Sequence, residues 1–135
     1  MPHDRARAAA DLGAPAGGGG LRRVGVFLAR LRCAMRRALR IARLARVRPQ
    51  ACKLFRTGAW PAGPYAAAVQ GASPSNIRTM RRAAAKATGI RASGRCATTA
   101  IALRLDGKGD PCVLFPVDQV KAWLQLWFDS EDVRT

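Results

Sequence analysis

The chain has 135 residues, 49% of them hydrophobic, and a formal net charge of +16. No carboxylate lies between Asp11 and Asp106, although that stretch holds 19 of the 24 lysines and arginines. Residues 12–105 therefore exclude a metal ion held by paired carboxylates and a carboxylate acid–base pair. Their unbalanced positive charge favours an anionic partner, most commonly a nucleic-acid backbone.

The rest of the composition indicates one domain with a thin core plus an arm. Alanine provides 27 residues, whereas four Phe, three Trp and one Tyr provide bulk. Cys33, Cys52, Cys96 and Cys112 match no zinc module and are expected to be free thiols in a reducing compartment. With His3 as the single histidine, we predict no metal site, no cofactor and no catalytic activity.

The N-terminal residues 1–20 end in four consecutive glycines and are predicted to form a disordered arm. No apolar run approaches the roughly 20 residues that a membrane-spanning helix needs, so no span is expected.

Residues 21–48 are predicted to form a long, basic, amphipathic helix. At about 100° per residue, its apolar side chains fall in one stripe of about 120°. This stripe contains Leu21, Val24, Phe27, Leu28, Leu31, Met35, Leu39 and Ala42. Val26, Ile41 and Leu44 lie off the stripe, where they are available to a second partner.

The arginines of this helix lie outside the stripe, except Arg46. A solvated charged face normally mixes signs, and this face does not, so we interpret it as a phosphate-binding surface rather than as a solvated face. The predicted nucleic-acid-binding residues here are Arg22, Arg23, Arg30, Arg32, Arg36, Arg37, Arg40 and Arg43.

Residues 49–129 are predicted to form a helical domain. A short helix over 49–57 stops at Gly58, a turn-rich joint covers 60–64, and a small-residue helix covers 65–70. Ser73 then caps a helix that ends at Gly89, with an apolar face of Ile77, Met80, Ala84 and Ala87. Its other face adds Arg78, Arg81, Arg82 and Lys86 to the predicted nucleic-acid-binding residues.

The C-terminal part begins with a loop over 90–96. Residues 98–105 are expected to be helical, although their propensity also allows a strand, and 106–109 form a turn. Asp110 is expected to cap a helix before Pro111, and Pro116 also precedes the last helix. That helix carries the heaviest apolar face, expected to pack in the core or against another polypeptide, with base stacking by its tryptophans as the alternative. The face contains Val117, Val120, Trp123, Leu124, Trp127 and Phe128, and an acidic tail over 130–135 follows.

A longer pattern runs through the middle of the chain. Lys53–Tyr65 reads KLFRTGAWPAGPY, and the pattern continues with Gly71-Ala72-Ser73-Pro74, Met80–Ala85, Gly94-Arg95 and Asp110-Pro111. It resembles the helical region downstream of the polymerase core in reverse transcriptases of non-LTR retrotransposons, over about residues 40–128. In that family, a Leu-Phe-Arg-x-Gly-x-x-Pro-x-x-x-Tyr-Gly segment precedes an arginine-rich helix that starts with Ser-Pro.

The chain departs from this family where catalysis is concerned. The Tyr-x-Asp-Asp turn of the polymerase is absent, and Ala66, Ala67 and Gln70 replace the usual glycine and acid after the tyrosine. No catalytic residue is carried over, so the resemblance implies a non-catalytic remnant of a retroelement reverse transcriptase, from a region that would pack near the template–primer duplex.

The sequence thus predicts an all-α protein, a small helical array with a long basic first helix and a disordered arm. We expect it to bind RNA or DNA without sequence preference, in the nucleus or the cytoplasm, with an organelle as the other location. Two alternatives remain: an independent basic RNA-binding protein such as a ribosomal or organellar component, and a membrane-active or imported protein acting through helix 21–48.

Overall fold

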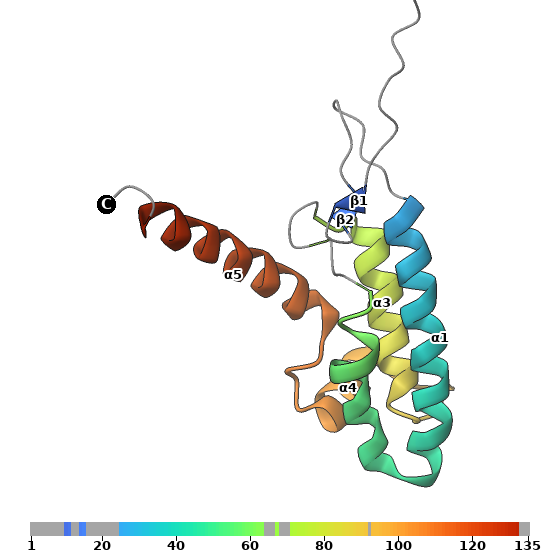
Figure 1. The fold of residues 1–135 in the computed structure, drawn as a ribbon. Coiled ribbons are helices and arrows are strands. Elements are labelled where there is room, and N and C mark those ends of the chain that lie inside the picture. Colours follow the sequence, from blue (N-terminus) through green and yellow to red (C-terminus); the bar gives the residue numbers. More distant parts are fainter. Residues whose placement is uncertain are drawn as a thin grey trace, which may run out of the picture.

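The computed structural model describes residues 10–11, 14–15, 25–63, 67, 71–91 and 93–132. Within this part the protein is a small helical array, which confirms the all-α prediction (Figure 1). Its helices are α1 (Gly25–Val47), the 3₁₀ turn η1 (Pro49–Lys53), the π turn η2 (Phe55–Ala59), α3 (Pro74–Ala87), α4 (Ala97–Leu105) and α5 (Pro111–Asp132). Of the predicted N-terminal arm, two paired strands are described, β1 (Ala10–Asp11) and β2 (Ala14–Pro15), and the rest lies outside the described residues.

Helix α1 confirms the long first helix, and residues 21–24 of the prediction lie outside the described part. The short helix that follows does not stop at Gly58 as predicted. It continues as a π turn, because the backbone amide of Trp60 donates to the carbonyl oxygen of Phe55 at 2.8 Å. This wider turn brings Phe55, Ala59 and Trp60 together into the core, so tertiary packing overrides the helix-breaking tendency of glycine.

Several predicted boundaries are confirmed. Ser73 Oγ accepts a hydrogen bond from the backbone amide of Asn76 at 3.3 Å at the start of α3. The ambiguous segment is the helix α4, and the turn after it covers 106–109. Of the predicted helix 65–70, only Ala67 is described, and it is buried and helical.

The packing of α1 against α3 forms the centre of the molecule. The two helices run parallel and side by side (Figure 1). Alanines bury themselves in this region from both helices, so the two backbones approach closely. The fully or nearly fully buried alanines are Ala34, Ala38 and Ala45 of α1 and Ala83, Ala84, Ala85 and Ala87 of α3.

This alanine contact corrects the predicted apolar stripe of α1. Leu39 was expected to be buried but is 47% exposed, whereas Ile41 was placed off the stripe but is only 7% exposed. Six of the seven buried positions, 27, 31, 34, 38, 41 and 45, are spaced alternately by four and three residues, and Ala42 is the seventh. This spacing is typical of a helix packed along a neighbouring helix, and it selects alanines that a search for large residues overlooks.

The larger core side chains lie between these two helices and the segments that cover them, η1, η2 and α4. Phe55, Met80 and Ile101 are fully buried there. The ring of Trp60 meets that of Phe115 edge-to-face, with centroids 4.8 Å apart. The buried aromatic residues Phe27, Phe55, Trp60 and Phe115 therefore fill space that the alanines leave open.

Helix α5 begins in the array and then leaves it (Figure 1). The Asp110 cap is confirmed, because the backbone amide of Cys112 donates to Asp110 Oδ1 at 3.0 Å. Pro116, however, lies inside α5 and not before it. The proline removes the bond that its own amide would give to the Cys112 carbonyl, and its ring crowds that carbonyl, yet α5 continues past it.

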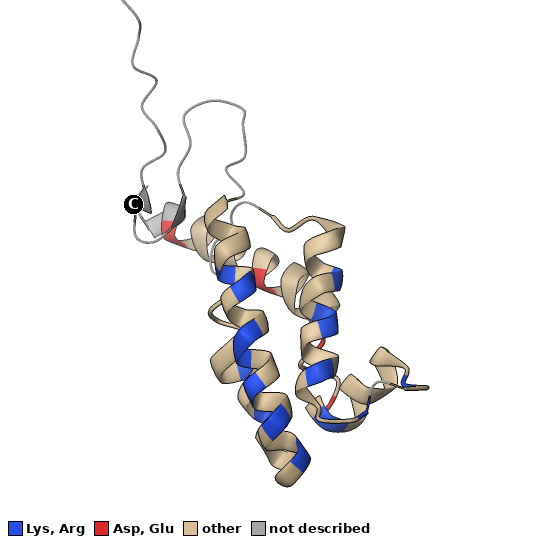
Figure 2. Cartoon of the chain, turned by 90° about the vertical axis from the view of Figure 1, so that its right-hand side faces the viewer, with Lys and Arg blue, Asp and Glu red and all other residues tan. Residues whose placement is uncertain are grey.

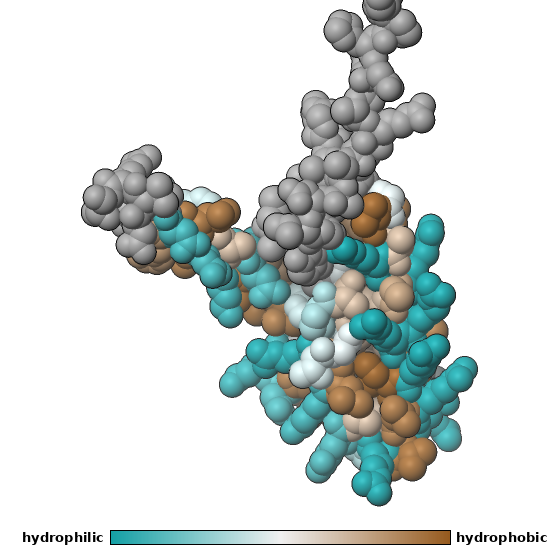
Figure 3. Space-filling model, in the orientation of Figure 1, coloured by the Kyte–Doolittle hydropathy of each residue, from teal (hydrophilic) through white to brown (hydrophobic). Residues whose placement is uncertain are grey.

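Of the two expectations for the last helix, packing in the core is not what the structure shows for most of its apolar face, and packing against another polypeptide stays a prediction. Phe115 is buried, but the face beyond it remains exposed, and Figure 3 shows hydrophobic surface along α5. Its exposed residues are Val113, Val117, Val120, Trp123, Leu124, Leu126, Trp127 and Phe128. Among the helices that the structure describes, none is long and apolar enough to cross a membrane.

A glycine substitution tests the α1–α3 contact. Gly89, after the end of α3, has φ +74°, and an added Cβ would lie 2.9 Å from the carbonyl carbon of Ala45 in α1. Gly94 has φ +66° but open space around its Cβ position. We expect Gly94→Ala to lower the unfolding free energy by about 1–2 kcal/mol through backbone strain. Gly89→Ala should lower the unfolding free energy by about 1–3 kcal/mol more than Gly94→Ala does, because its Cβ clashes with Ala45.

Chemical denaturation of both variants measures this difference. Equal losses for the two variants would contradict the close approach of α1 to the end of α3.

Candidate nucleic-acid interface

The outer side of α1 carries a row of arginines. At about 100° per residue, Arg32, Arg36, Arg40 and Arg43 fall within about 80° of one another, opposite the buried alanines. All four are exposed. The row extends over 12 residues, or about 16 Å from its first to its last residue.

Helix α3 carries a second row. Arg78, Arg82 and Lys86 follow one another at every fourth residue, and all three are exposed. Because α1 and α3 lie side by side with their alanines facing the array, both rows face outward. Figure 2 shows basic residues along two neighbouring helices on one face of the molecule. We call these seven residues the basic face.

The acidic side chains that the structure describes lie elsewhere. Asp106 and Asp110 belong to the turn between α4 and α5, and Asp118 and Asp129 belong to α5. Trp60 Nε1 donates to Asp118 Oδ2 at 3.2 Å. The positive potential of the basic face is therefore not offset by a described carboxylate on the same face.

A shallow hollow of about 540 Å³ lies between α1 and α3. Leu28, Leu31, Met35 and Thr79 line it, and Arg32 and Arg36 stand beside it. Guanidinium groups bind phosphate through paired N–H donors, and a neighbouring apolar surface suits sugars or base edges. The arrangement thus provides phosphate contacts next to a mostly apolar floor.

Not every predicted residue belongs to the basic face. Arg37 turns toward η2, where its Nη1 donates to the carbonyl oxygen of Gly58 at 2.9 Å. Arg30 lies on the same side of α1 as Arg37 and is half-buried. Arg22 and Arg23 lie outside the described residues. The structure therefore narrows the predicted surface of α1 to four arginines.

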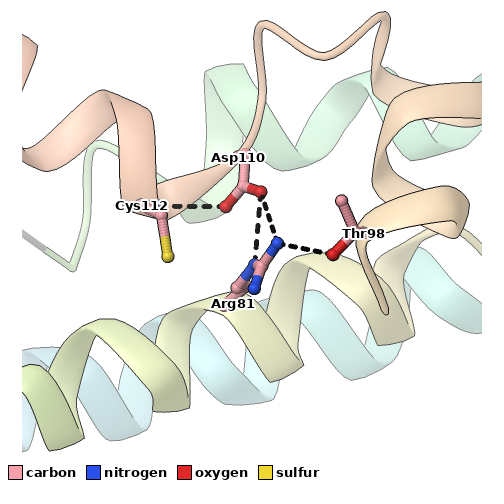
Figure 4. A network of polar contacts seen from close by, with 4 residues as sticks. All are labelled: Arg81, Thr98, Asp110 and Cys112. Carbon is pink, nitrogen blue, oxygen red and sulfur yellow. Dashed lines mark hydrogen bonds and ion pairs between the residues drawn. The ribbon is translucent and has the colours of Figure 1, made fainter. Parts of the chain in front are cut away.

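Arg81 also has a different place. Its guanidinium forms an ion pair with Asp110, with 3.1 Å between Nη2 and Oδ2, and donates to Thr98 Oγ1 at 2.8 Å (Figure 4). The other oxygen of Asp110 caps α5 through the Cys112 amide. Arg81 thus joins α3 to the start of both α4 and α5. This structural role replaces the nucleic-acid contact that the sequence predicted for it.

Other arginines gather at the end of the array where α1 and α3 both finish. Arg46, Arg91 and Arg104 line a hollow of about 450 Å³ there, with Thr88. Arg95 Nη1 donates to the carbonyl oxygens of Ala85 and Ile90, at 3.0 and 2.6 Å. Two parallel helices present their negative dipole ends at this place, and the arginines offset them.

This cluster was missed by the sequence analysis. Its members come from three segments that are distant along the chain, so no local spacing signals them.

Reactive groups are sparse in the described part of the chain. No three His, Cys, Asp or Glu residues come together there as a metal site would require. Cys96 is the residue that precedes α4. The backbone amide of Thr99, followed by the hydroxyl of Thr99 and the amide and hydroxyl of Thr98, lowers the pKa of this exposed thiol to about 7.

Charge reversal on α1 tests the basic face. The change Arg36→Glu, Arg40→Glu, Arg43→Glu should weaken binding of a short RNA by well over tenfold, because each lost phosphate contact also loses a counterion release. The helix should persist, since none of the three side chains is buried.

The matched control is Arg48→Glu, Lys53→Glu, Arg56→Glu, which changes the net charge equally at exposed positions around η1 and η2. Fluorescence anisotropy compares the affinities, and circular dichroism checks the fold. Equal weakening by both triple variants would show that net charge alone, and not this face, attracts the RNA.

Neighbouring arginines of α3 give a second test. Arg81→Gln should lower the unfolding free energy by about 1–3 kcal/mol, because it leaves the buried Asp110 without its ion-pair partner. Affinity for RNA per folded molecule should stay within about twofold. Arg82→Gln should do the reverse, weakening binding with little loss of stability. If Arg81→Gln weakened RNA binding and Arg82→Gln lowered stability, the structural role of Arg81 and the binding role of Arg82 would be contradicted.

Comparison of the chain with protein-family models, with curated proteins and with solved structures finds no match in any of the three. The resemblance to a retroelement region therefore stays a prediction. The candidate interface rests on the charge, exposure and arrangement of its own residues.

Proposed function

We infer that this protein binds the phosphate backbone of RNA or DNA through the basic face, without catalysing a reaction and with little sequence preference. The observation that carries the proposal is the alignment of two rows of exposed cations on parallel helices, with no described acid among them.

The alternative of an ordinary solvated surface is less consistent with this arrangement. Solvent-exposed helix faces usually carry both positive and negative side chains, so that neighbouring charges attract each other. On α1 and α3, the residues three or four positions apart within each row are all positive. Such a surface repels itself in water, and a polyanion relieves the repulsion and releases counterions.

The burial of α1 also weighs against a membrane-active role. A helix that lies on a membrane must present its apolar side to lipid. In this protein, that side holds Phe27, Leu31 and Ile41, and all three are buried in the array. Lipid binding through α1 would therefore require the array to open.

The low sequence preference follows from the chemistry of the site. Arginine and lysine on a helix surface contact phosphates readily, whereas sequence is read by side chains that reach base edges. The tryptophans of α5 lie on a helix that points away from the array, so stacking on bases is not part of this proposal (Figure 1).

We also propose, from the sequence resemblance alone, that the chain descends from the region after the polymerase core of a retroelement reverse transcriptase. The other origin is an independent basic RNA-binding protein. Finding the coding sequence in frame beside a block that encodes Tyr-x-Asp-Asp would support the first, and a free-standing gene with its own promoter would support the second.

Salt dependence tests the proposed function. If five to seven phosphates are engaged, the logarithm of the association constant should fall against the logarithm of the salt concentration with a slope of about −4 to −6. Anisotropy of a labelled single strand and a labelled duplex of different sequences measures the slope and the preference. Affinity that does not change with salt, or tighter binding to anionic vesicles than to either oligonucleotide, would contradict the proposal.

A further inference from the structure

The exposed side of α5 has the spacing of a helix-pairing surface. Val113, Val117, Val120 and Leu124 follow one another at intervals of four, three and four residues, and each is 40–55% exposed. This alternation places the four side chains on one line along the helix, as in a coiled coil. Trp123 and Phe128 flank the line on its two sides. We call the four-residue line the α5 seam.

Hydrophobic side chains are not confined to the seam. Leu126, on the opposite side of α5, is 66% exposed. A helix that is apolar over most of its circumference is normally covered by protein. No element of the described part of the chain covers the outer half of α5, so its occupant must come from elsewhere.

The charges of α5 indicate what that occupant is like. The helix contains one basic residue, Lys121, and four acidic ones. Three of these, Asp129, Glu131 and Asp132, fall at its C-terminal end, which carries no basic residue in its last turn. Acidic residues at this end oppose the helix dipole. A cationic surface placed against them would remove the conflict.

A cationic surface lies at the N-terminal end of α5, which we call its root. A hollow of about 550 Å³ is lined mainly by apolar groups, among them Trp60, Val113, Phe115 and Val117. Arg56, Lys108, Lys121 and Asp118 also line it, so its charged groups are three positive and one negative. The root of α5 is thus apolar with positive charges, and the end of α5 is apolar with negative charges.

We propose that two copies of this chain associate by antiparallel pairing of their α5 helices. In this pairing, the end of each helix lies over the root of the other. A two-fold axis near Val120 places Val117 opposite Leu124 of the second copy. The contact is the same in both directions, as a two-fold dimer requires.

The exposed surface includes large apolar side chains. Aromatic side chains bury about 150–250 Å² each, and Trp123 and Phe128 are 59% and 64% exposed. With the aliphatic residues of the seam and the hollow at the root of α5, they would form the apolar centre of an interface of roughly 800 Å² per partner. The pairing also keeps the two basic faces away from each other, because α5 points away from α1 and α3 (Figure 1). The proposal does not rest on nucleic-acid binding.

Analytical ultracentrifugation of the nuclease-treated full chain tests the association, in about 0.3 M salt so that long-range repulsion is screened. We expect a monomer–dimer equilibrium. Leu124→Lys should raise the dissociation constant at least about tenfold, since it places a charge in the seam. Leu126→Lys, the same change on the opposite side of the helix, should have little effect. Circular dichroism confirms that both variants fold.

Disulfide trapping tests the orientation, in a background where the exposed Cys33, Cys96 and Cys112 are replaced by serine. Val120→Cys lies near the two-fold axis and should cross-link two copies. Val113→Cys should not, because antiparallel pairing places the two copies of this position far apart.

Three results would overturn the proposal. These are a wild-type monomer up to about 0.1 mM, equal effects of the two lysine variants, and efficient cross-linking through Val113→Cys. If Leu124→Lys leaves a monomer unchanged but weakens RNA binding, α5 serves nucleic acid and not a second copy.

Discussion

The close packing of α1 against α3 determines the rest of the structure. Alanines on both helices allow their backbones to approach, and Gly89 has no room for a Cβ beside the end of α1. Small side chains contribute little hydrophobic free energy each, so the contact depends on many of them acting over its whole length. Large side chains are then needed only on the side of the two helices that η1, η2 and α4 cover, and these segments supply them.

The candidate function follows from this contact. Because α1 and α3 are parallel and adjacent, the cations on their outer sides form two rows on one face and not two separate surfaces. The same parallel arrangement gathers two helix C-termini at one end, which explains why Arg46, Arg91, Arg95 and Arg104 collect there. The arginine content of the chain thus divides into residues that face solvent and residues that satisfy the backbone.

Arg81 and Asp110 show how one ion pair organises the C-terminal half. Asp110 caps α5 with one oxygen and holds Arg81 of α3 with the other. The root of α5 is fixed in this way, while its outer half projects with an apolar surface. A thin alanine core has no room for that surface, so an intermolecular contact is the natural place for it.

Local signals in the sequence were sufficient for much of the fold. Capping by Ser73 and Asp110 and the end of α3 near Gly89 follow from residues close together in the chain, whereas the helix expected over 98–105 rested on the helices around it. Tertiary contacts decided the rest. The continuation of η2 past Gly58 depends on burial of Phe55 and Trp60, and the inward turn of Ile41 depends on where α3 lies.

The candidate site was predictable to a similar degree. Charge and helical period identified the row Arg32, Arg36, Arg40 and Arg43, because both are properties of one continuous segment. Arg37 and Arg81 share the same local pattern but meet partners 21 and 29 residues away. A helical projection of one segment does not contain such distant partners. It therefore cannot distinguish a structural arginine from an exposed one.

The most direct test of the account is an NMR titration of the arginine side-chain Nε–Hε signals with a short single-stranded RNA. Progressive shifts of the Arg36, Arg40 and Arg82 signals, with those of Arg81 nearly unchanged, are the result that the account predicts. Shifts confined to Arg81, or to the indole signal of Trp123 on α5, would contradict binding at the face that α1 and α3 form together.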